Sequence, residues 1–425
     1  MLALVAAPAV VFADADDQAT TSGGPPAGLQ PLSAPFPAAT PFAGESPLRR
    51  REDGTFEAIP KVSGTTKTFT IVARYAPWEL KPGLTVLAKA YNGVVPGPTI
   101  VVNQGDRVVI DYRNELDIPD TIHLHGIHGT SSDMDGVPGS AQAMVEPHGT
   151  FRYAFTAPQP GTFIYHTHDA KAVLDAGLYG GIIVKPSHPL PEEIAARDYL
   201  EMISSWYVNS AGESEFTLNG KEYPVTKPID VRRGEKVRVR WINISAENFH
   251  TMHTHGHYMT IVARDAVPLA YKDVEDTVEI GPGQRIDTTI VADTKPGTWM
   301  VHCHVLDHIE DGQAMPDGLI TSIHYIGTPD TTTAMYHAMM KTMGGGSMNM
   351  AGMPPAAPAG RLSFGMTALL GAFAGVTIFL GLPIARARKL KPTVIGLLNA
   401  FAIGILVFLV IEISMNAIIP VNRAI

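Results

Sequence analysis

Apolar and polar residues alternate over short stretches in most of the chain, and turn residues separate these stretches. Alternation with a period of two is typical of strands that bury one face. It predicts strands near residues 68–75, 99–102, 107–112, 121–127, 150–155, 161–167 and 181–184. Short strands at this spacing favour a sandwich or barrel over alternating strands and helices.

A second set of predicted strands, at residues 198–326, repeats the plan of the first. Gly-Asp-Arg-Val at 105–108 and His-Leu-His-Gly at 123–126 correspond to Gly-Glu-Lys-Val at 234–237 and His-Thr-His-Gly at 253–256. Pro-Gly-Thr-Phe-Ile-Tyr-His-Thr-His at 160–168 corresponds to Pro-Gly-Thr-Trp-Met-Val-His-Cys-His at 296–304. The sequence therefore predicts two copies of one β domain, at 59–190 and 191–328.

Different compositions flank the two domains. Residues 1–13 form an apolar run with a small-residue cleavage pattern, which predicts an export signal. Residues 14–58 are rich in Pro, Gly, Ala and Ser and predict a linker. Residues 329–360 form a Met-rich linker, which is either a Cu(I)-binding segment or a spacer.

The C-terminal part, residues 361–422, contains two apolar runs long enough to be transmembrane helices. A short basic loop between them, with Arg386, Arg388, Lys389 and Lys391, is expected on the cytoplasmic side, which places the β domains outside the cytoplasm. Glu412 lies inside the second run, and the pair faintly resembles the opening helices of ZIP metal transporters. We expect a membrane anchor, with a truncated transporter as the alternative.

The formal net charge is −9, which argues against nucleic acid as a partner because phosphate binding needs a basic surface. Cys303 is the only cysteine, so no internal disulfide forms. A free thiol in an exported protein is a liability unless a metal binds it.

Cys303 lies between His302 and His304, and His308 follows shortly after. Side chains alternate across a strand, so Cys303 faces one way and the two flanking histidines face the other. Cys303 and His308 with one further imidazole would form the His₂Cys set of an electron-transfer copper site. The flanking histidines would serve a second metal site on the other face.

Four His-x-His pairs occupy equivalent places in the two repeats, and this regularity favours a metal cluster over structural histidines. The pairs are His123 and His125, His166 and His168, His253 and His255, and His302 and His304. Eight imidazoles suffice for three copper ions if one takes two and a coupled pair takes three each. The cysteine position is Thr167 in the first repeat, so a thiolate site is predicted only in the second.

These motifs, with Asn-Gly-Val-Val-Pro-Gly-Pro-Thr-Ile at 92–100 and Met-Asp-Gly-Val-Pro-Gly at 134–139, resemble those of the multicopper oxidases, in particular the small two-domain laccases. The resemblance implies an all-β fold of two cupredoxin-like Greek-key sandwiches. It also implies four coppers per subunit, and a homotrimer with a cluster at each subunit interface.

By the same resemblance, His250, Cys303 and His308 bind a blue copper. His123 and His253 bind the lone copper of the cluster, and the other six paired histidines bind the coupled pair. The axial group of the blue copper is either Gln313 or Met315, with Met315 slightly favoured. Asp135 matches the acidic residue that relays protons to the cluster, and its alternative role is a turn aspartate before Gly136. We expect His257 to lie beside the metal ligands without binding metal.

The implied activity is oxidation of a phenol or of a metal ion such as Cu(I), coupled to reduction of O₂ to water. One alternative is a copper nitrite reductase, which would need its cysteine in the first domain. A second is a surface copper-binding or electron-transfer protein without enzymatic activity. Oxygen consumption distinguishes this second alternative from an oxidase.

Overall fold

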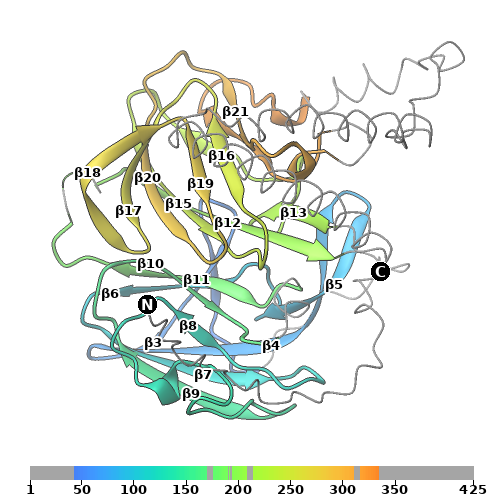
Figure 1. Cartoon of the computed structure of the whole chain (residues 1–425), viewed down its shortest axis with the longest axis vertical. Helices are drawn as coiled ribbons and strands as arrows, with labels where there is room; N and C mark the ends of the chain where they lie inside the picture. Colours follow the sequence, from blue (N-terminus) through green and yellow to red (C-terminus); the bar gives the residue numbers. More distant parts are fainter. Residues whose placement is uncertain are drawn as a thin grey trace, which may run out of the picture. The chain divides into compact units, whose positions relative to one another are not determined.

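The computed structural model describes residues 43–169, 176–189, 191, 194–207, 214–310 and 316–334. These residues fold mainly into β-strands (Figure 1). None of their helices is long and apolar enough to cross a bilayer. The predicted export signal, Met-rich linker and membrane helices lie almost entirely outside the described residues.

The first domain is a sandwich of two sheets. One sheet has the strand order β1-β2-β6-β11-β10-β8, and the other has the order β3-β4-β7-β9 with β5 paired to β4. The strands are β1 (Leu48–Arg50), β2 (Phe56–Ala58), β3 (Lys61–Ser63), β4 (Thr66–Lys81), β5 (Leu84–Tyr91), β6 (Gly97–Asn103), β7 (Arg107–Asn114), β8 (His123–His125), β9 (Thr150–Thr156), β10 (Gly161–His166) and β11 (Tyr179–Lys185).

The second domain is also a sandwich of two sheets. Their strand orders are β13-β12-β15-β20-β17-β18 and β14-β22-β21-β16-β19. The strands are β12 (Arg197–Tyr207), β13 (Ser214–Leu218), β14 (Ile229–Val231), β15 (Lys236–Asn243), β16 (His250–Thr254), β17 (Met259–Arg264), β18 (Val267–Glu275), β19 (Thr277–Ile280), β20 (Arg285–Val291), β21 (Thr298–Cys303) and β22 (Ile320–Tyr325). Short 3₁₀ helices, Ser132–Met134 and Leu306–His308, lie in loops of the two domains.

The strand pairing repeats between the domains. In the first, β10 pairs antiparallel with β8 and β11, and β11 pairs parallel with β6. In the second, β21 pairs antiparallel with β16 and β22, and β22 pairs parallel with β14. The sequence repeat therefore corresponds to two β-sandwiches with the same pairing around the histidine-bearing strands.

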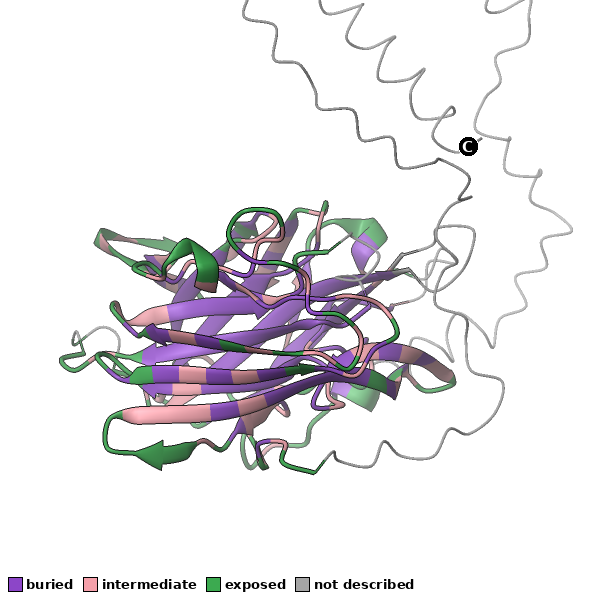
Figure 2. Cartoon of the chain, turned by 90° about the horizontal axis from the view of Figure 1, so that it is seen from below, coloured by how far each residue is buried: buried purple, intermediate pink, exposed green. Residues whose placement is uncertain are grey.

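Each sandwich has its own apolar core, and a third cluster joins the two domains. Buried residues follow the inner faces of the strands, whereas turns and edges are exposed (Figure 2). The joining cluster packs Leu80 and Ile164 of the first domain with Leu200, Trp206 and Ile242 of the second. Removal of these large side chains from water holds the two sandwiches together.

The structure corrects the predicted linker at residues 14–58, because its last part forms β1 and β2. The backbone of β2 pairs with β6, and Glu45 forms an ion pair with Arg74 at 2.9 Å. These partners are distant in sequence, so composition alone did not reveal them. All seven strands predicted for the first domain have a counterpart, whereas β3 and β5 were not predicted.

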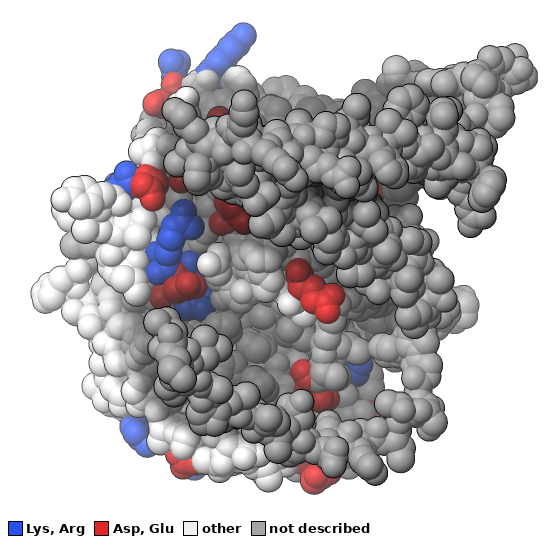
Figure 3. Space-filling model, viewed as in Figure 1, with Lys and Arg blue, Asp and Glu red and all other residues white. Residues whose placement is uncertain are grey.

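Acidic and basic side chains are interspersed on the described surface of the face drawn in Figure 3. Ion pairs of the described residues include Arg49 with Glu57 at 2.7 Å and Lys67 with Asp106 at 2.7 Å.

Candidate metal centres

Strand β21 presents different side chains to its two sides, as the sequence predicted. Cys303 is completely buried and belongs to the apolar core of the second domain. His302 is half-buried and His304 is exposed. In the first domain, β10 has the same arrangement, with Tyr165 and Thr167 buried and His166 half-buried. Each of these strands therefore connects a sandwich core to a group of histidines.

Cys303, His250 and His308 converge in the core of the second domain. The Nδ1 atoms of the two histidines are 3.0 Å apart. The Sγ atom of Cys303 lies 3.9 Å from Nδ1 of His250 and 3.6 Å from Nδ1 of His308. Metal bonds of about 2.0–2.3 Å to nitrogen and sulfur produce separations of this size, so the three donors fit one ion.

The two imidazoles of this site differ in their surroundings and in their exposure to solvent. Nε2 of His250 lies 3.0 Å from the hydroxyl of Ser245, and His250 is completely buried. His308 is 9% exposed, and the ring of Phe216 lies 4.1 Å from its own ring. His308 is therefore the imidazole of this pair that lies nearer to solvent.

Burial favours the uncharged form of these ligands. Burial, followed by the neighbouring His308, lowers the pKa of His250 to about 3, and burial raises the pKa of the Cys303 thiol. A neutral imidazole has a free lone pair for metal, whereas the thiol must lose its proton to a bound metal. The His₂Cys donor set is the one that selects copper.

A second group of histidines lies in the first domain. The ring of His123 lies 5.2–5.5 Å from the rings of His125, His166 and His168. Ligand atoms of His123, His125 and His166 all lie within 4.8 Å of one another. Burial, and to a smaller extent the charge of Arg285, lowers the pKa of His125 to about 4. Burial lowers the pKa of His166 to about 3.

A third group, in the second domain, mirrors the second. The ring of His253 lies 4.8–5.8 Å from the rings of His255, His302 and His304. Nδ1 of His302 lies 2.8 Å from the carbonyl oxygen of Cys303, and Nδ1 of His166 lies 2.6 Å from that of Thr167. If each Nδ1 donates to its carbonyl, Nε2 is the atom left for metal.

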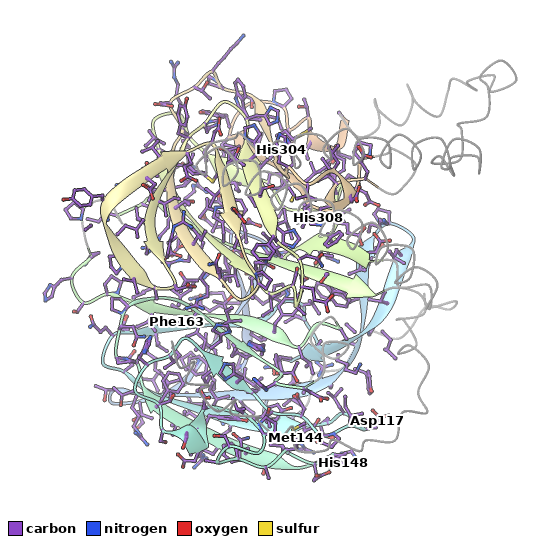
Figure 4. All side chains as sticks on the ribbon, viewed as in Figure 1. Asp117, Met144, His148, Phe163, His304 and His308 are labelled. Carbon is purple, nitrogen blue, oxygen red and sulfur yellow. The ribbon has the colours of Figure 1, made fainter. Side chains whose placement is uncertain are left out.

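The two groups of four are separate within the chain. Among the described residues, no ring contact or electrostatic interaction joins a histidine of one group to a histidine of the other. In Figure 4, His304 lies in the second domain and Phe163 lies on β10 of the first. The described part of the chain thus holds these eight histidines as two groups of four, each of which is called a half-site.

Asp135 lies beside His123, as the sequence predicted. Its carbonyl oxygen is 2.7 Å from Nδ1 of His123, and its carboxylate, whose side chain is 40% exposed, is 3.6 Å from the same atom. Sequence reasoning missed the equivalent residue of the second domain, Asp276, whose carbonyl oxygen is 2.9 Å from Nδ1 of His253. No Met-Asp-Gly motif marks Asp276, so only the strand pairing reveals it.

Other supporting residues also escaped sequence reasoning. Ser245 and Phe216 contact site histidines, and the charge of Arg285 acts on the pKa of His125, but none of the three stands in a recognisable motif. His257 lies where the prediction placed it, beside the ligands. Its Nδ1 lies 3.0 Å from the carbonyl of His255, and its Nε2 lies 2.9 Å from the hydroxyl of Tyr325. Both candidate axial groups, Gln313 and Met315, lie outside the described residues.

The first domain holds different residues at the positions of the thiolate site. Thr167 stands at the cysteine position and Asp120 at the position of His250, and both are buried. The hydroxyl of Tyr112 donates to the carboxylate of Asp120. The third position, Ala172, lies outside the described residues. Asp120 provides a carboxylate where the second domain has the imidazole of His250, and Thr167 provides a hydroxyl where it has the thiol of Cys303.

Two family models match the chain, both described as multicopper oxidase, at residues 73–189 and 198–316. "Laccase-2" of Botryotinia fuckeliana is 31% identical over 254 residues, which are 52% of this chain and 43% of that protein. This chain thus spans less than half the length of that laccase.

Solved structures also match the fold. The multicopper oxidase mgLAC is 34% identical, with a TM-score of 0.59 over 62% of this chain and 87% of that chain. The blue copper oxidase from Nitrosomonas europaea is 36% identical, with a TM-score of 0.58 over 61% of this chain and 85% of that chain.

Replacement of Gly136 by Ala tests whether the turn after Asp135 positions His123. Gly136 has a φ of +83°, and an added Cβ would lie 1.9 Å from the carbonyl oxygen of Ile122. We expect Gly136→Ala to cost more than about 3 kcal/mol of stability and to lower the copper content of the first-domain histidines.

Gly139→Ala is the matched control, because Gly139 has a φ of +79° and open space around its Cβ position. It should cost only about 1–2 kcal/mol, the penalty of the left-handed conformation itself. Chemical denaturation and copper analysis measure both effects. Equal stability and equal copper content in the two variants would contradict this role of the turn.

Proposed function

The chain belongs to the multicopper oxidase family, and from this we propose that it oxidises a reducing substrate by single electrons and reduces O₂ to water. The observation that carries the proposal is β21, which connects the buried Cys303 to His302 and His304 at the adjoining half-site. The cysteine lies in the second domain, whereas the nitrite reductase alternative would need it in the first.

We assign the copper ligands as follows. His250, Cys303 and His308 hold the blue copper. His123 and His253 hold the lone copper of the cluster, and His125, His166, His168, His255, His302 and His304 hold the coupled pair. Support comes from the converging donors of the first set and from the matching geometry of the two groups of four. When bound, copper supplies one-electron redox chemistry and O₂ binding.

The chain itself supplies the route for electrons. His308 is the partly exposed ligand of the blue site, so a reductant reaches its edge more readily than that of the buried His250. Cys303 is joined by one peptide bond to each of His302 and His304. This covalent path runs from the core of the domain to the half-site without crossing solvent.

The substrate is a phenol or a metal ion such as Cu(I). Oxygen uptake with each reductant, measured on the copper-loaded protein, separates the two. Export and membrane anchoring, which would place this reaction outside the cytoplasm, remain predictions from residues outside the described part of the chain.

We further propose that the cluster assembles between subunits, in a homotrimer. Each domain contributes four cluster histidines, and the two groups are separate within the chain. A cyclic assembly allows the first-domain group of one subunit to meet the second-domain group of the next. The exposure of His168, His255 and His304 supports this arrangement, because exposed ligands are available to a neighbouring subunit.

Replacement of Cys303 by Ser tests the function directly. We expect the parent protein to be blue and to consume O₂, whereas Cys303→Ser should be colourless and should lose O₂ uptake with every reductant. Because its cluster histidines remain, the variant should retain three of the four coppers. Oxygen uptake at the parent rate by the variant would exclude the oxidase mechanism. A blue parent without O₂ uptake would favour the electron-carrier alternative.

Complementation tests the assembly. His125→Ala inactivates the first-domain group, and His255→Ala inactivates the second-domain group, so each variant alone should lack O₂ uptake. In trimers formed by co-expression of both, about a quarter of the interfaces combine two intact groups. We expect about a quarter of the parent activity, together with a trimer mass. A monomer mass, or co-expressed protein as inactive as each variant, would contradict assembly between subunits.

Asp135→Asn tests the proton-relay role of Asp135. Its carboxylate lies beside His123 and is partly exposed, so it connects the half-site to solvent. We expect the amide to slow O₂ reduction by about 10²-fold or more, because it cannot accept and release a proton. Anaerobic reduction of the blue site, followed by stopped-flow absorbance, should keep its parent rate. Equal slowing of both steps would assign Asp135 a structural role instead.

A further inference from the structure

The β4-β5 hairpin of the first domain lies against the second domain near the Cys303 site. Nε1 of Trp78 donates to the carbonyl of Gly220 at 2.6 Å, and the amide of Glu222 donates to the carbonyl of Leu80 at 2.9 Å. Nζ of Lys221 lies 4.3 Å from the centre of the Trp78 ring. The hairpin and the turn at residues 219–223 thus form one contact between the domains.

Lys81, the last residue of β4, places its ammonium group among three carboxylates of the second domain. Nζ lies 2.8 Å from Glu222 and 3.2 Å from Glu215, and it also donates to Asp317. The Glu222 side chain is completely buried, and that of Lys81 is 24% exposed. A single cation of the first domain therefore joins three separate segments of the second.

Two of these segments contact the copper ligands proposed for the blue site. Glu215 precedes Phe216, whose ring packs on His308. Asp317 precedes Gly318 and Leu319, and the amide of Leu319 donates to the carbonyl of His308 at 3.0 Å.

The same segment also fixes the cysteine. The carbonyl of Leu319 accepts a hydrogen bond from the amide of Cys303 at 3.0 Å. Gly318 has a φ of +58°, and an added Cβ would lie 2.4 Å from the carbonyl of His308, so the segment packs closely on the ligand loop.

The ammonium group of Lys81 is the positive partner of these three acidic side chains. Burial, followed by the neighbouring charge of Glu215, raises the pKa of Glu222 to about 9. Burial lowers the pKa of Lys81, but Glu222 and Asp317 outweigh it and hold this pKa above its ordinary value. Lys81 therefore stays charged at neutral pH. Without Lys81, the carboxylates of Glu215 and Asp317 lose their positive partner, and the segments would move apart.

We propose that Lys81 is a positioning residue for the blue site, through which the first domain sets the geometry of Cys303 and His308 in the second. This proposal rests on the copper assignment made above. Lys81 touches neither ligand and acts through the segments of Glu215 and Asp317. Residues outside the ligand set that orient ligands have a measurable effect on metal affinity.

The test uses copper titration of the full-length apoprotein, with blue absorbance reporting the Cys303 site and total copper reporting the cluster. We expect Lys81→Met to weaken copper binding at the blue site by about tenfold and to alter its electron paramagnetic resonance spectrum. Copper binding at the cluster should be unchanged. Lys81→Arg should restore the parent behaviour, because it keeps the positive charge.

Lys221→Met is the matched control, because Lys221 belongs to the same domain contact but contacts the Trp78 ring and the carbonyl of Glu79. It should leave the blue site unchanged. Parent affinity and spectrum in Lys81→Met would overturn the proposal, and so would equal weakening of all four coppers. A colourless parent protein would instead refute the copper assignment itself.

Discussion

The alternation of side chains along a β-strand is the constraint on which both candidate metal centres depend. On β21 it directs Cys303 into an apolar core, while His302 and His304 face the other way. Successive residues of a strand cannot share a face. The thiol of Cys303 and the two flanking histidines are therefore held apart and yet joined by single peptide bonds. The pairing of β21 with β16 then brings Met252 opposite Cys303 and His253 opposite His302.

Hydrogen bonds from the backbone complete this arrangement. Carbonyl oxygens lie beside Nδ1 of His123, His166, His253 and His302, so that the opposite nitrogen of each ring is presented for metal. Two of these carbonyls belong to the residue that follows the histidine on the strand. His166 and His302 are thus oriented by the next residue along the chain. His123 and His253 are oriented by Asp135 and Asp276 in neighbouring loops.

The sequence predicted the features that depend on local order. The period of two and the duplicated motifs predicted the two sandwiches, and the order of residues around Cys303 predicted that it faces away from its flanking histidines. His250 was placed with Cys303 only through the family resemblance. Features that depend on partners distant in sequence were not predicted. The strand β5, the roles of β1 and β2, and the contacts of Asp276, Ser245 and Lys81 all arise from tertiary packing. Sequence alone does not distinguish Lys81 from a surface lysine, because the three acids that contact it are distant along the chain.

The long strand β4 has a consequence for how such a protein can diversify. It has 16 residues: Thr66–Ala73 pair with β7 inside the first sandwich, and Lys81 at its end reaches the second. The duplicated units are therefore not interchangeable modules. A second unit taken from another protein would preserve this contact only if it placed acids opposite Lys81.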